Sequence, residues 1–297
     1  MIKEISIAGY QGSNSIHTKS IKYFIDNIRN EFNVDYTMDI TANNEKASTL
    51  IEKTIDQKID ISYLLSSYYE NILPEIKILD LPYFFNSRNE AYNLLKSDFF
   101  NFINSKLLKK NIKLLGFWDN GIRHFSSQKI IEQPQDCIGQ ILRTTPSPLH
   151  IEIFKSLGFI PNPLDVRDFK VAIKDNTINA QENPLTNYWN FEIYNHQKFV
   201  TLSSHMFGFC LFVINNIFFK SLNLKQQNKI LDTAFKSTEF QRNLAIKEDD
   251  ILMKKIKEKG IKVVKPQTKN LDEFKKITKV FHESYFNENP HMKKFIL

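Results

Sequence analysis

Three polar side chains stand in a row within the segment INAQENPLTNYW, residues 178–189: Gln181, Glu182 and Asn183. The two amides can each donate and accept hydrogen bonds, and a carboxylate such as Glu182 can act as a general acid or base. No second carboxylate, nucleophile or metal ligand accompanies Glu182 in a recognised motif. This favours a structural Glu182, bonded to the backbone or to a partner that spans two halves of the fold. Asn183 precedes Pro184, so it is also a reasonable N-cap for the helix that begins there.

Arg143 is a second residue whose type and position suggest ligand binding. It follows Ile141 and Leu142 in a pattern typical of a buried strand, so we expect its guanidinium to be partly desolvated. A guanidinium is a planar fork of five donors that matches a carboxylate bidentately, and such charge-assisted bonds are strong. Spacing alone favours an internal salt bridge to a nearby Asp or Glu, and that alternative stays open.

The sequence holds no motif for a metal or a nucleotide. The seven histidines show neither HxxxH nor HxH spacing, so we expect no metal site. The segment AGYQGSNS, residues 8–15, has two glycines after a predicted strand but matches neither GxGxxG nor the P-loop pattern, so we expect no nucleotide cofactor. Cys137 and Cys210 lack metal-ligand spacing, and the sequence does not decide whether they form a disulfide.

The bulk composition excludes several classes of protein. With 297 residues, 42% hydrophobic and 25% charged, the chain is long and apolar enough for one large domain or two ordinary ones. The net charge of +7 comes from lysines scattered among acidic residues. Their densest run, residues 251–265, is typical of the solvent-exposed face of a helix followed by a strand. Because no nucleic-acid-binding motif accompanies the charge, we expect no nucleic-acid partner.

No segment is apolar enough to cross a bilayer, which needs about 20 residues. The most apolar run, residues 207–219, is too short and contains Asn215 and Asn216. Met1 is followed directly by the strand-like segment IKEISIAG, not by a secretory signal. The protein is therefore expected to be either cytoplasmic, or exported with a leader that Met1 replaces.

Strand and helix patterns alternate along the chain, which predicts an α/β fold with parallel pairing and both faces of the sheet covered. Asp165 has the type and position of a helix N-cap. The expected strands are residues 3–9, 34–40, 59–65, 112–120, 139–145, 177–184, 198–205, 207–215 and 260–266. The expected helices are residues 17–32, 44–58, 88–110, 149–158, 166–175, 222–259 and 271–286.

The absence of a flexible linker predicts two lobes between which the chain crosses more than once. Ligands of open α/β sheets bind outside the carboxyl ends of the strands, so we expect a cleft between the lobes. Three expected strand ends should face it: residues 118–123, Arg143 and Asn183. The predicted division gives residues 1–122 and about 213–250 to lobe I, residues 123–212 and about 251–275 to lobe II, and about 276–297 to a C-terminal helix packed on the lobes.

Five segments occur in an order that resembles a known family: LPYFF (81–85), GFWDNGIRHFSS (116–127), ILRTTPSPLHIEIFKSLGFIPNPL (141–164), INAQENPLTNYW (178–189) and NHQKFVTLSSH (195–205). Each string alone is a weak signal, but the ordered set is specific and covers most of the chain. It is similar to the periplasmic solute-binding proteins of tripartite ATP-independent (TRAP) transporters, of the C4-dicarboxylate-binding, DctP-like type.

The resemblance implies a two-lobed periplasmic-binding-protein fold that closes on a small organic anion, such as a C4-dicarboxylate or related carboxylate, without catalysis and without a cofactor. It implies that Arg143 grips the ligand carboxylate, that Asn183 and Arg123 help to hold the ligand, and that Gln181 and Glu182 orient the loop. It also implies delivery to a TRAP membrane permease and a periplasmic location, with the leader removed.

Further residues are expected around the ligand. The loop at residues 9–17 and the turn at residues 66–68 match the family only loosely, so these segments should set the choice of substrate. Large aromatic residues near predicted loops belong either to the core or to the walls of the cleft. Besides Arg143, Asn183 and Arg123, the expected ligand-binding residues are Trp118, Ser67, Tyr68, Tyr10 and Phe207.

Two other functions remain as alternatives. An α/β enzyme acting on a small carboxylic acid would use Glu182 as its base and Arg143 as its anchor, and turnover of a ligand would favour it. A ligand-sensing module would need a signalling partner, and no output domain accompanies the two lobes.

Overall fold

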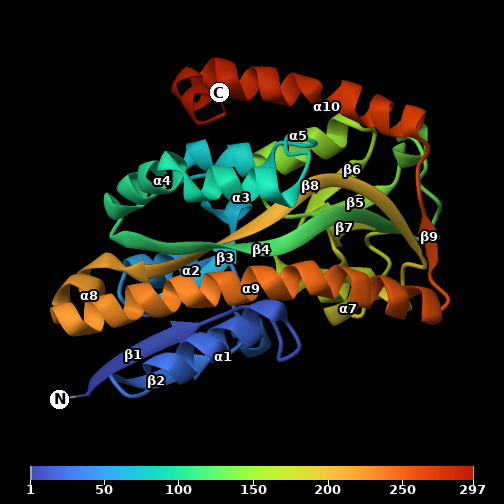
Figure 1. The fold of residues 1–297 in the computed structure, drawn as a ribbon. Coiled ribbons are helices and arrows are strands. Elements are labelled where there is room, and N and C mark those ends of the chain that lie inside the picture. Colours follow the sequence, from blue (N-terminus) through green and yellow to red (C-terminus); the bar gives the residue numbers. More distant parts are fainter. Residues whose placement is uncertain (1, 297) are drawn as a thin grey trace.

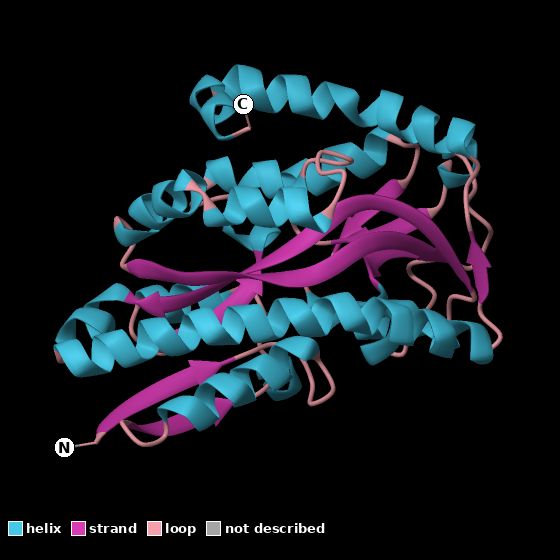
Figure 2. Cartoon of the chain, in the orientation of Figure 1, coloured by secondary structure: helices cyan, strands magenta, loops and turns pink. Residues whose placement is uncertain are grey.

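One mixed β-sheet runs through the whole molecule, and helices cover both of its faces (Figures 1 and 2). The computed structural model describes residues 2–296, with the side chain of residue 170 excepted. The strand order is β2-β1-β3-β8-β4-β7-β5-β6, and β9 pairs with β8. The strands are β1 Lys3–Ala8, β2 Phe32–Thr37, β3 Ile61–Leu65, β4 Ile112–Ser127, β5 Ile141–Thr144, β6 Ile160–Pro163, β7 Ala180–Pro184, β8 Phe199–Asn215 and β9 Lys262–Val264.

The helices alternate with these strands, as the sequence predicts. They are α1 Ile16–Ile28, α2 Thr49–Ile55, α3 Arg88–Lys96, α4 Asp98–Leu108, α5 Pro148–Ser156, α6 Val166–Lys174, α7 Leu185–Asn190, α8 Asn216–Ser221, α9 Leu224–Glu258 and α10 Thr268–Glu288. Short 3-10 helices are η1 Ile40–Asn43, η2 Ser66–Tyr69, η3 Pro74–Asp80, η4 Pro134–Cys137, η5 Ile193–Asn195 and η6 Pro290–Phe295. No described helix is both long enough and apolar enough to span a membrane.

The predicted parallel pairing is right for the outer strands and wrong for the centre of the sheet. β1 pairs parallel with β2 and β3, and β5 pairs parallel with β6 and β7. In the centre, β8 runs antiparallel to β3 and β4, and β4 runs antiparallel to β7. The reason is the length of β4 and β8, which extend through both halves of the molecule and run past each other in opposite directions.

β8 corrects a second expectation, because the two strands predicted at residues 198–205 and 207–215 are one. Ser204 has a positive φ of 46°, and the β4–β8 register shifts between Arg123 and Phe125. This irregularity bends the strand where the sequence pattern suggested a break. Similarly, residues 118–123 were expected at a strand end but lie in the middle of β4, which continues to Ser127.

Smaller differences have local causes. The helix predicted at residues 88–110 is divided at Ser97, whose hydroxyl accepts from the backbone N–H of Phe99 and caps α4. β6 was not predicted. It contains Pro161 and Pro163 and lies at the sheet edge, where proline is tolerated. Asp165 caps α6 as expected.

Three hydrophobic clusters define two lobes. The largest surrounds β1, β3 and α1 and is called lobe I; the other two surround β5, β7 and α5–α7 and together form lobe II. β4 contributes Phe117 to lobe I and Phe125 to lobe II. β8 contributes Phe212 to lobe I and Val200 to lobe II. α9 follows these strands along one face of the sheet, with α10 on the opposite side (Figure 1). The chain therefore crosses between the lobes more than once, as predicted.

Candidate ligand-binding site

The carboxyl ends of the lobe I strands meet those of the lobe II strands, and the two lobes touch there. The Asp165 carboxylate, just after β6, accepts hydrogen bonds from the backbone N–H groups of Ala47 at 3.0 Å and Ser48 at 3.2 Å. The Ser67 hydroxyl, just after β3, donates to Thr145 Oγ1 at 3.3 Å. We call this meeting region the junction. These hydrogen bonds join the two lobes directly at the junction.

Arg143 lies in β5 at the junction and is only 2% exposed. Its Nε and Nη2 both donate to the backbone carbonyl of Leu164, at 3.0 and 2.6 Å. The guanidinium carbon lies 4.9 Å from the centre of the Phe169 ring, over which the cation stacks. Among the described side chains, no Asp or Glu forms an ion pair with Arg143. Burial lowers the pKa of Arg143, as expected for a cation without an acid bonded to it.

The internal salt bridge that spacing favoured for Arg143 is therefore absent. A backbone carbonyl and an aromatic face fix the orientation of the guanidinium but do not neutralise its charge. A buried charge without a counter-ion is unfavourable, so the site is electrostatically prepared for an anion.

Arg123, by contrast, has a full internal partner. It is 1% exposed, and its Nε and Nη2 donate to Glu182 Oε2 at 2.5 Å and Oε1 at 2.7 Å. Nη2 also donates to the Glu182 carbonyl, while Nη1 is buried and has no partner among the described residues. Arg123 thus offers a ligand the two N–H donors of Nη1, but its charge is already compensated.

Glu182 is a structural carboxylate, as the sequence interpretation favoured. Thr144 Oγ1 donates to its Oε1 at 3.2 Å, and His205 Nε2 lies 3.5 Å from its Oε2. Burial alone raises the pKa of Glu182, but the charge of Arg123 and the hydrogen bonds from His205 and Arg123 outweigh it and hold the pKa well below its usual range. Such a carboxylate stays ionised and is a weak base.

Asn183 is joined to its neighbours through both ends of its amide. Its Nδ2 donates to Gln181 Oε1 at 2.5 Å, and its Oδ1 accepts from Asn187 Nδ2 at 3.0 Å. Gln181 in turn donates to the Ser126 hydroxyl at 2.5 Å. Asn183 is therefore not the N-cap of α7; Pro184 takes that position, without a side-chain cap. One N–H and one lone pair of the Asn183 amide remain for a ligand.

The other expected site residues are divided between the junction and the core. Ser67 and Tyr68 belong to η2 at the junction, and the buried Tyr68 hydroxyl has no partner among the described residues. Burial and the charge of Asp165 raise the pKa of Tyr68. Tyr10, Trp118 and Phe207 pack in the lobe I core. The Tyr10 hydroxyl lies 3.7 Å from Cys210 Sγ, and the Trp118 indole N–H donates to Thr238. Cys210 and Cys137 are both free thiols.

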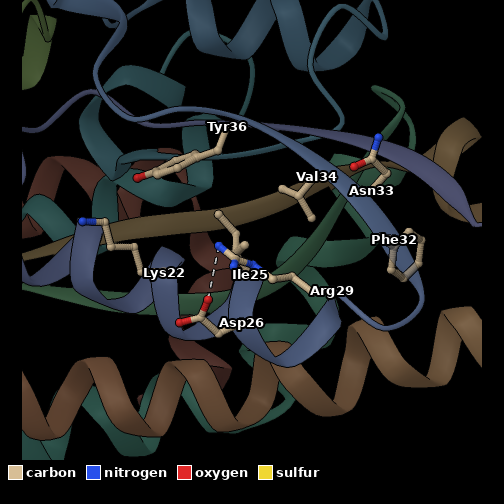
Figure 3. A pocket seen from close by; sticks show the side chains of 8 residues that line it. All are labelled: Lys22, Ile25, Asp26, Arg29, Phe32, Asn33, Val34 and Tyr36. Carbon is tan, nitrogen blue, oxygen red and sulfur yellow. Dashed lines mark ion pairs between the residues drawn. The ribbon is translucent and has the colours of Figure 1, made fainter.

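A separate hollow of about 630 Å³ lies on the surface of lobe I between α1 and β2 (Figure 3). Its charged residues are Lys22, Asp26 and Arg29, and Arg29 Nη2 lies 3.4 Å from Asp26 Oδ1. β2 is the edge strand on the lobe I side of the sheet, whereas Arg143 in β5 lies on the other side of β4. This hollow is not part of the junction, and no expected site residue lines it.

Comparison with known proteins identifies the family. The sequence profile of the bacterial extracellular solute-binding proteins, family 7, called DctP, matches residues 7–289. The chain belongs to this family. Among its relatives, the 2,3-diketo-L-gulonate-binding periplasmic protein YiaO of Escherichia coli is 27% identical over 219 residues, which make up 73% of this chain and 67% of that protein.

Solved structures of TRAP solute-binding proteins share the fold of this DctP family member. The sugar acid binding protein DctPAm of Advenella mimigardefordensis, in complex with galactonate, superposes with a TM-score of 0.92 at 23% identity, covering 97% of this chain and 94% of that one. A periplasmic protein of Sulfurospirillum deleyianum with bound succinate gives a TM-score of 0.90 at 22% identity, covering 96% and 95%.

Several residues at the junction were not expected from the sequence. No feature of the sequence marked Phe169 as the ring on which Arg143 stacks. Asp165 was expected only as an N-cap. Asn187 lies in α7, four residues after Asn183 in β7, and only the structure shows that their amides bond.

Proposed function

We propose that this DctP family member binds a small organic acid anion at the junction, with Arg143 pairing with its carboxylate, and delivers it to a TRAP membrane permease. The observation that carries the proposal is the enclosed Arg143 guanidinium, held by a carbonyl and a ring but not by an acid. The names of related proteins support it, since galactonate, succinate and 2,3-diketo-L-gulonate are all carboxylates. Those names also support a periplasmic location.

Other junction residues would complete the binding site. The free Nη1 of Arg123 can donate a second bond to the carboxylate, and Asn183 has one unused donor and one unused acceptor. Tyr68 and Ser67 reach the junction from lobe I. A ligand would therefore contact both lobes, and only in the closed form would all of these bonds form together.

Binding and closure are coupled for this reason. A ligand shifts an open–closed equilibrium only by its difference in affinity for the two forms. Moving a mostly open population to a mostly closed one requires roughly 5 kcal/mol. One bidentate Arg–carboxylate contact and two further bonds are sufficient, because each bond to a charged group contributes about 1.5–3 kcal/mol. The contacts between Asp165 and lobe I stabilise the same closed form.

The ligand would be bound without chemical change. Glu182, the carboxylate closest to a catalytic role, has both oxygens occupied and a lowered pKa. A general base needs a pKa near the working pH and access to a substrate proton. Glu182 meets neither requirement, which disfavours the enzyme alternative.

The proposal is tested by isothermal titration with a panel of small organic acids, followed by recovery of the ligand. We expect one-to-one binding of at least one acid, recovery of that acid unchanged, and a smaller radius of gyration by X-ray scattering when it is bound. Conversion of the acid to a product, or no binding by any carboxylic acid in the panel, would contradict it.

A further inference from the structure

Buried cations are few in this protein. Among the described side chains, the buried Lys or Arg residues are Arg123, Arg143 and Arg242. Arg242 belongs to α9 and donates to the Phe117 carbonyl in lobe I. Arg123 is neutralised by Glu182. Arg143 is therefore the one buried cation at the junction, within the described chain, that has no acid bonded to it.

Asp165 and Glu182, two buried acids at the junction, supply negative charge and no counter-ion for a ligand anion. Asp165 is 6% exposed and lies close enough to Arg143 for its charge to affect the pKa of Arg143. Its carboxylate is bonded to backbone N–H groups of lobe I, not to a cation. One anionic group of a ligand would be balanced by Arg143. A second, enclosed by the closed lobes, would meet no counter-ion, and an unpaired buried charge is strongly unfavourable.

Neutral polar atoms, by contrast, are in excess at this edge of lobe I and on α7. Gln11 Nε2 and Asn187 Oδ1 are buried without a partner among the described residues, as is the Tyr68 hydroxyl. Gln11 follows Tyr10, which is near enough to Arg123 to affect its pKa, and Asn187 is bonded to Asn183. Buried polar groups in native proteins nearly always have a partner. A hydroxyl or carbonyl oxygen of a ligand could accept from Gln11 Nε2, and a ligand hydroxyl could donate to Asn187 Oδ1.

We propose that the ligand carries a single carboxylate, bound by Arg143, and that the rest of it is uncharged and bears hydroxyl or carbonyl groups that bond Gln11, Tyr68 and Asn187. This inference rests on the proposed function and narrows its substrate class. Monocarboxylic hydroxy acids, oxo acids and sugar acids fit it, and dicarboxylates do not.

Matched acid pairs test the inference by titration calorimetry. The two members of each pair differ only in one terminal group, which is CH₂OH in the monoacid and a carboxylate in the diacid: galactonate with galactarate, gluconate with glucarate, and 4-hydroxybutanoate with succinate. For every pair in which either member binds, we expect the monoacid to bind more tightly by on the order of 100-fold, the scale of an uncompensated buried charge.

A pair of variants tests whether the neutral atoms contact the ligand. Gln11→Leu should weaken binding of the preferred hydroxylated acid about ten-fold by removing one donor. Gln140→Leu is the matched control, because Gln140 is also a buried amide with one unpartnered atom but lies in lobe II beside Asp136. It should leave the affinity unchanged.

Three outcomes are distinguishable. Preference for the monoacids with a selective effect of Gln11→Leu supports the inference. A diacid that binds as tightly as its monoacid, or an affinity that Gln11→Leu does not change, overturns it and leaves the proposed function in place. Failure of every acid in every pair to bind, together with failure of every other acid in the wider panel, would overturn the proposed function and this inference together.

Discussion

Arg123 and Glu182 hold each other in a two-pronged ion pair that is sealed from solvent. Two guanidinium nitrogens reach the two carboxylate oxygens at 2.5 and 2.7 Å, and both residues are at most 1% exposed. Arg123 belongs to β4, which crosses between the lobes, and Glu182 to the neighbouring β7. The pair therefore joins the crossing strand to lobe II beside the proposed ligand site, and it neutralises one of the two arginines there.

Removing the acid of this pair should be strongly destabilising. Glu182→Gln leaves the Arg123 cation buried without a counter-ion, and breaking a buried pair in this way costs about 3–5 kcal/mol. Urea denaturation should show that loss in the free energy of unfolding. The double variant Arg123→Met with Glu182→Leu should recover most of it, because neither charge is left unpaired. A Glu182→Gln protein within about 0.5 kcal/mol of the parent, the range of ordinary surface changes, would contradict this account.

Asp165 should control how long the lobes stay closed. Asp165→Ser keeps a good N-cap for α6, but the shorter side chain cannot reach both Ala47 and Ser48 in lobe I. The closed complex should therefore open sooner. The dissociation rate of the ligand should rise about ten-fold, as expected for one lost bond to a charged group. Stopped-flow fluorescence measures this rate. Asp136→Ser is the control, since Asp136 accepts backbone bonds within lobe II only. Equal rates for both variants would refute the role of Asp165.

The sequence predicted the local structure around Arg143 and Asp165, but not their contacts with distant parts of the chain. The apolar residues before Arg143 indicated a buried strand, and the strand is there. Whether an acid lies beside the guanidinium depends on chain segments far away, so the salt-bridge alternative could not be excluded by spacing. Asp165 shows the same limit. Its capping role follows from its neighbours along the chain, whereas its bond to Ala47 joins residues 118 positions apart.

The sequence predicted most helices and strands, but not the arrangement of the central strands β4 and β8. Helix and strand periodicity located most elements, because each buries one face against its neighbours. β4 and β8 were misjudged because irregular backbone at Ser204 and a register shift near Arg123 interrupt the pattern without ending the strand. Periodicity also carries no information on strand direction, so the antiparallel centre required the three-dimensional structure.

His17 should make the protein less stable as the pH falls. Burial lowers the pKa of His17 from 6.5 to about 3, because the ring packs on Tyr63 and its Nε2 has no partner within the described chain. The unfolded chain therefore binds one more proton than the folded protein between these two pH values. The contribution of His17 to the free energy of unfolding is therefore largest above pH 6.5 and falls progressively toward pH 3. Between pH 7 and pH 5 the loss is about 2 kcal/mol, at 1.36 kcal/mol per unit.

His17→Leu should remove that share of the pH dependence. Chemical denaturation at pH 7 and pH 5 gives a difference in the free energy of unfolding for each protein, and the variant's difference should be smaller by about 2 kcal/mol. Because other groups titrate in both proteins, only this change between them is diagnostic. An identical pH dependence in the two proteins would show that His17 is not held neutral by burial.

The most direct test of the account compares two arginines that have nearly the same surroundings. Arg143 and Arg242 each donate twice to one backbone carbonyl, and their guanidinium carbons lie 4.9 and 4.5 Å from the centres of the Phe169 and Tyr92 rings. Only Arg143 lies at the junction. Titration calorimetry should use an acid that the parent protein binds. Arg143→Ala should lose at least 100-fold in affinity for this acid, which is the scale of a lost bidentate pair. A folded Arg242→Ala should change the affinity less than three-fold. An Arg143→Ala protein that binds the acid as tightly as the parent would contradict the central claim.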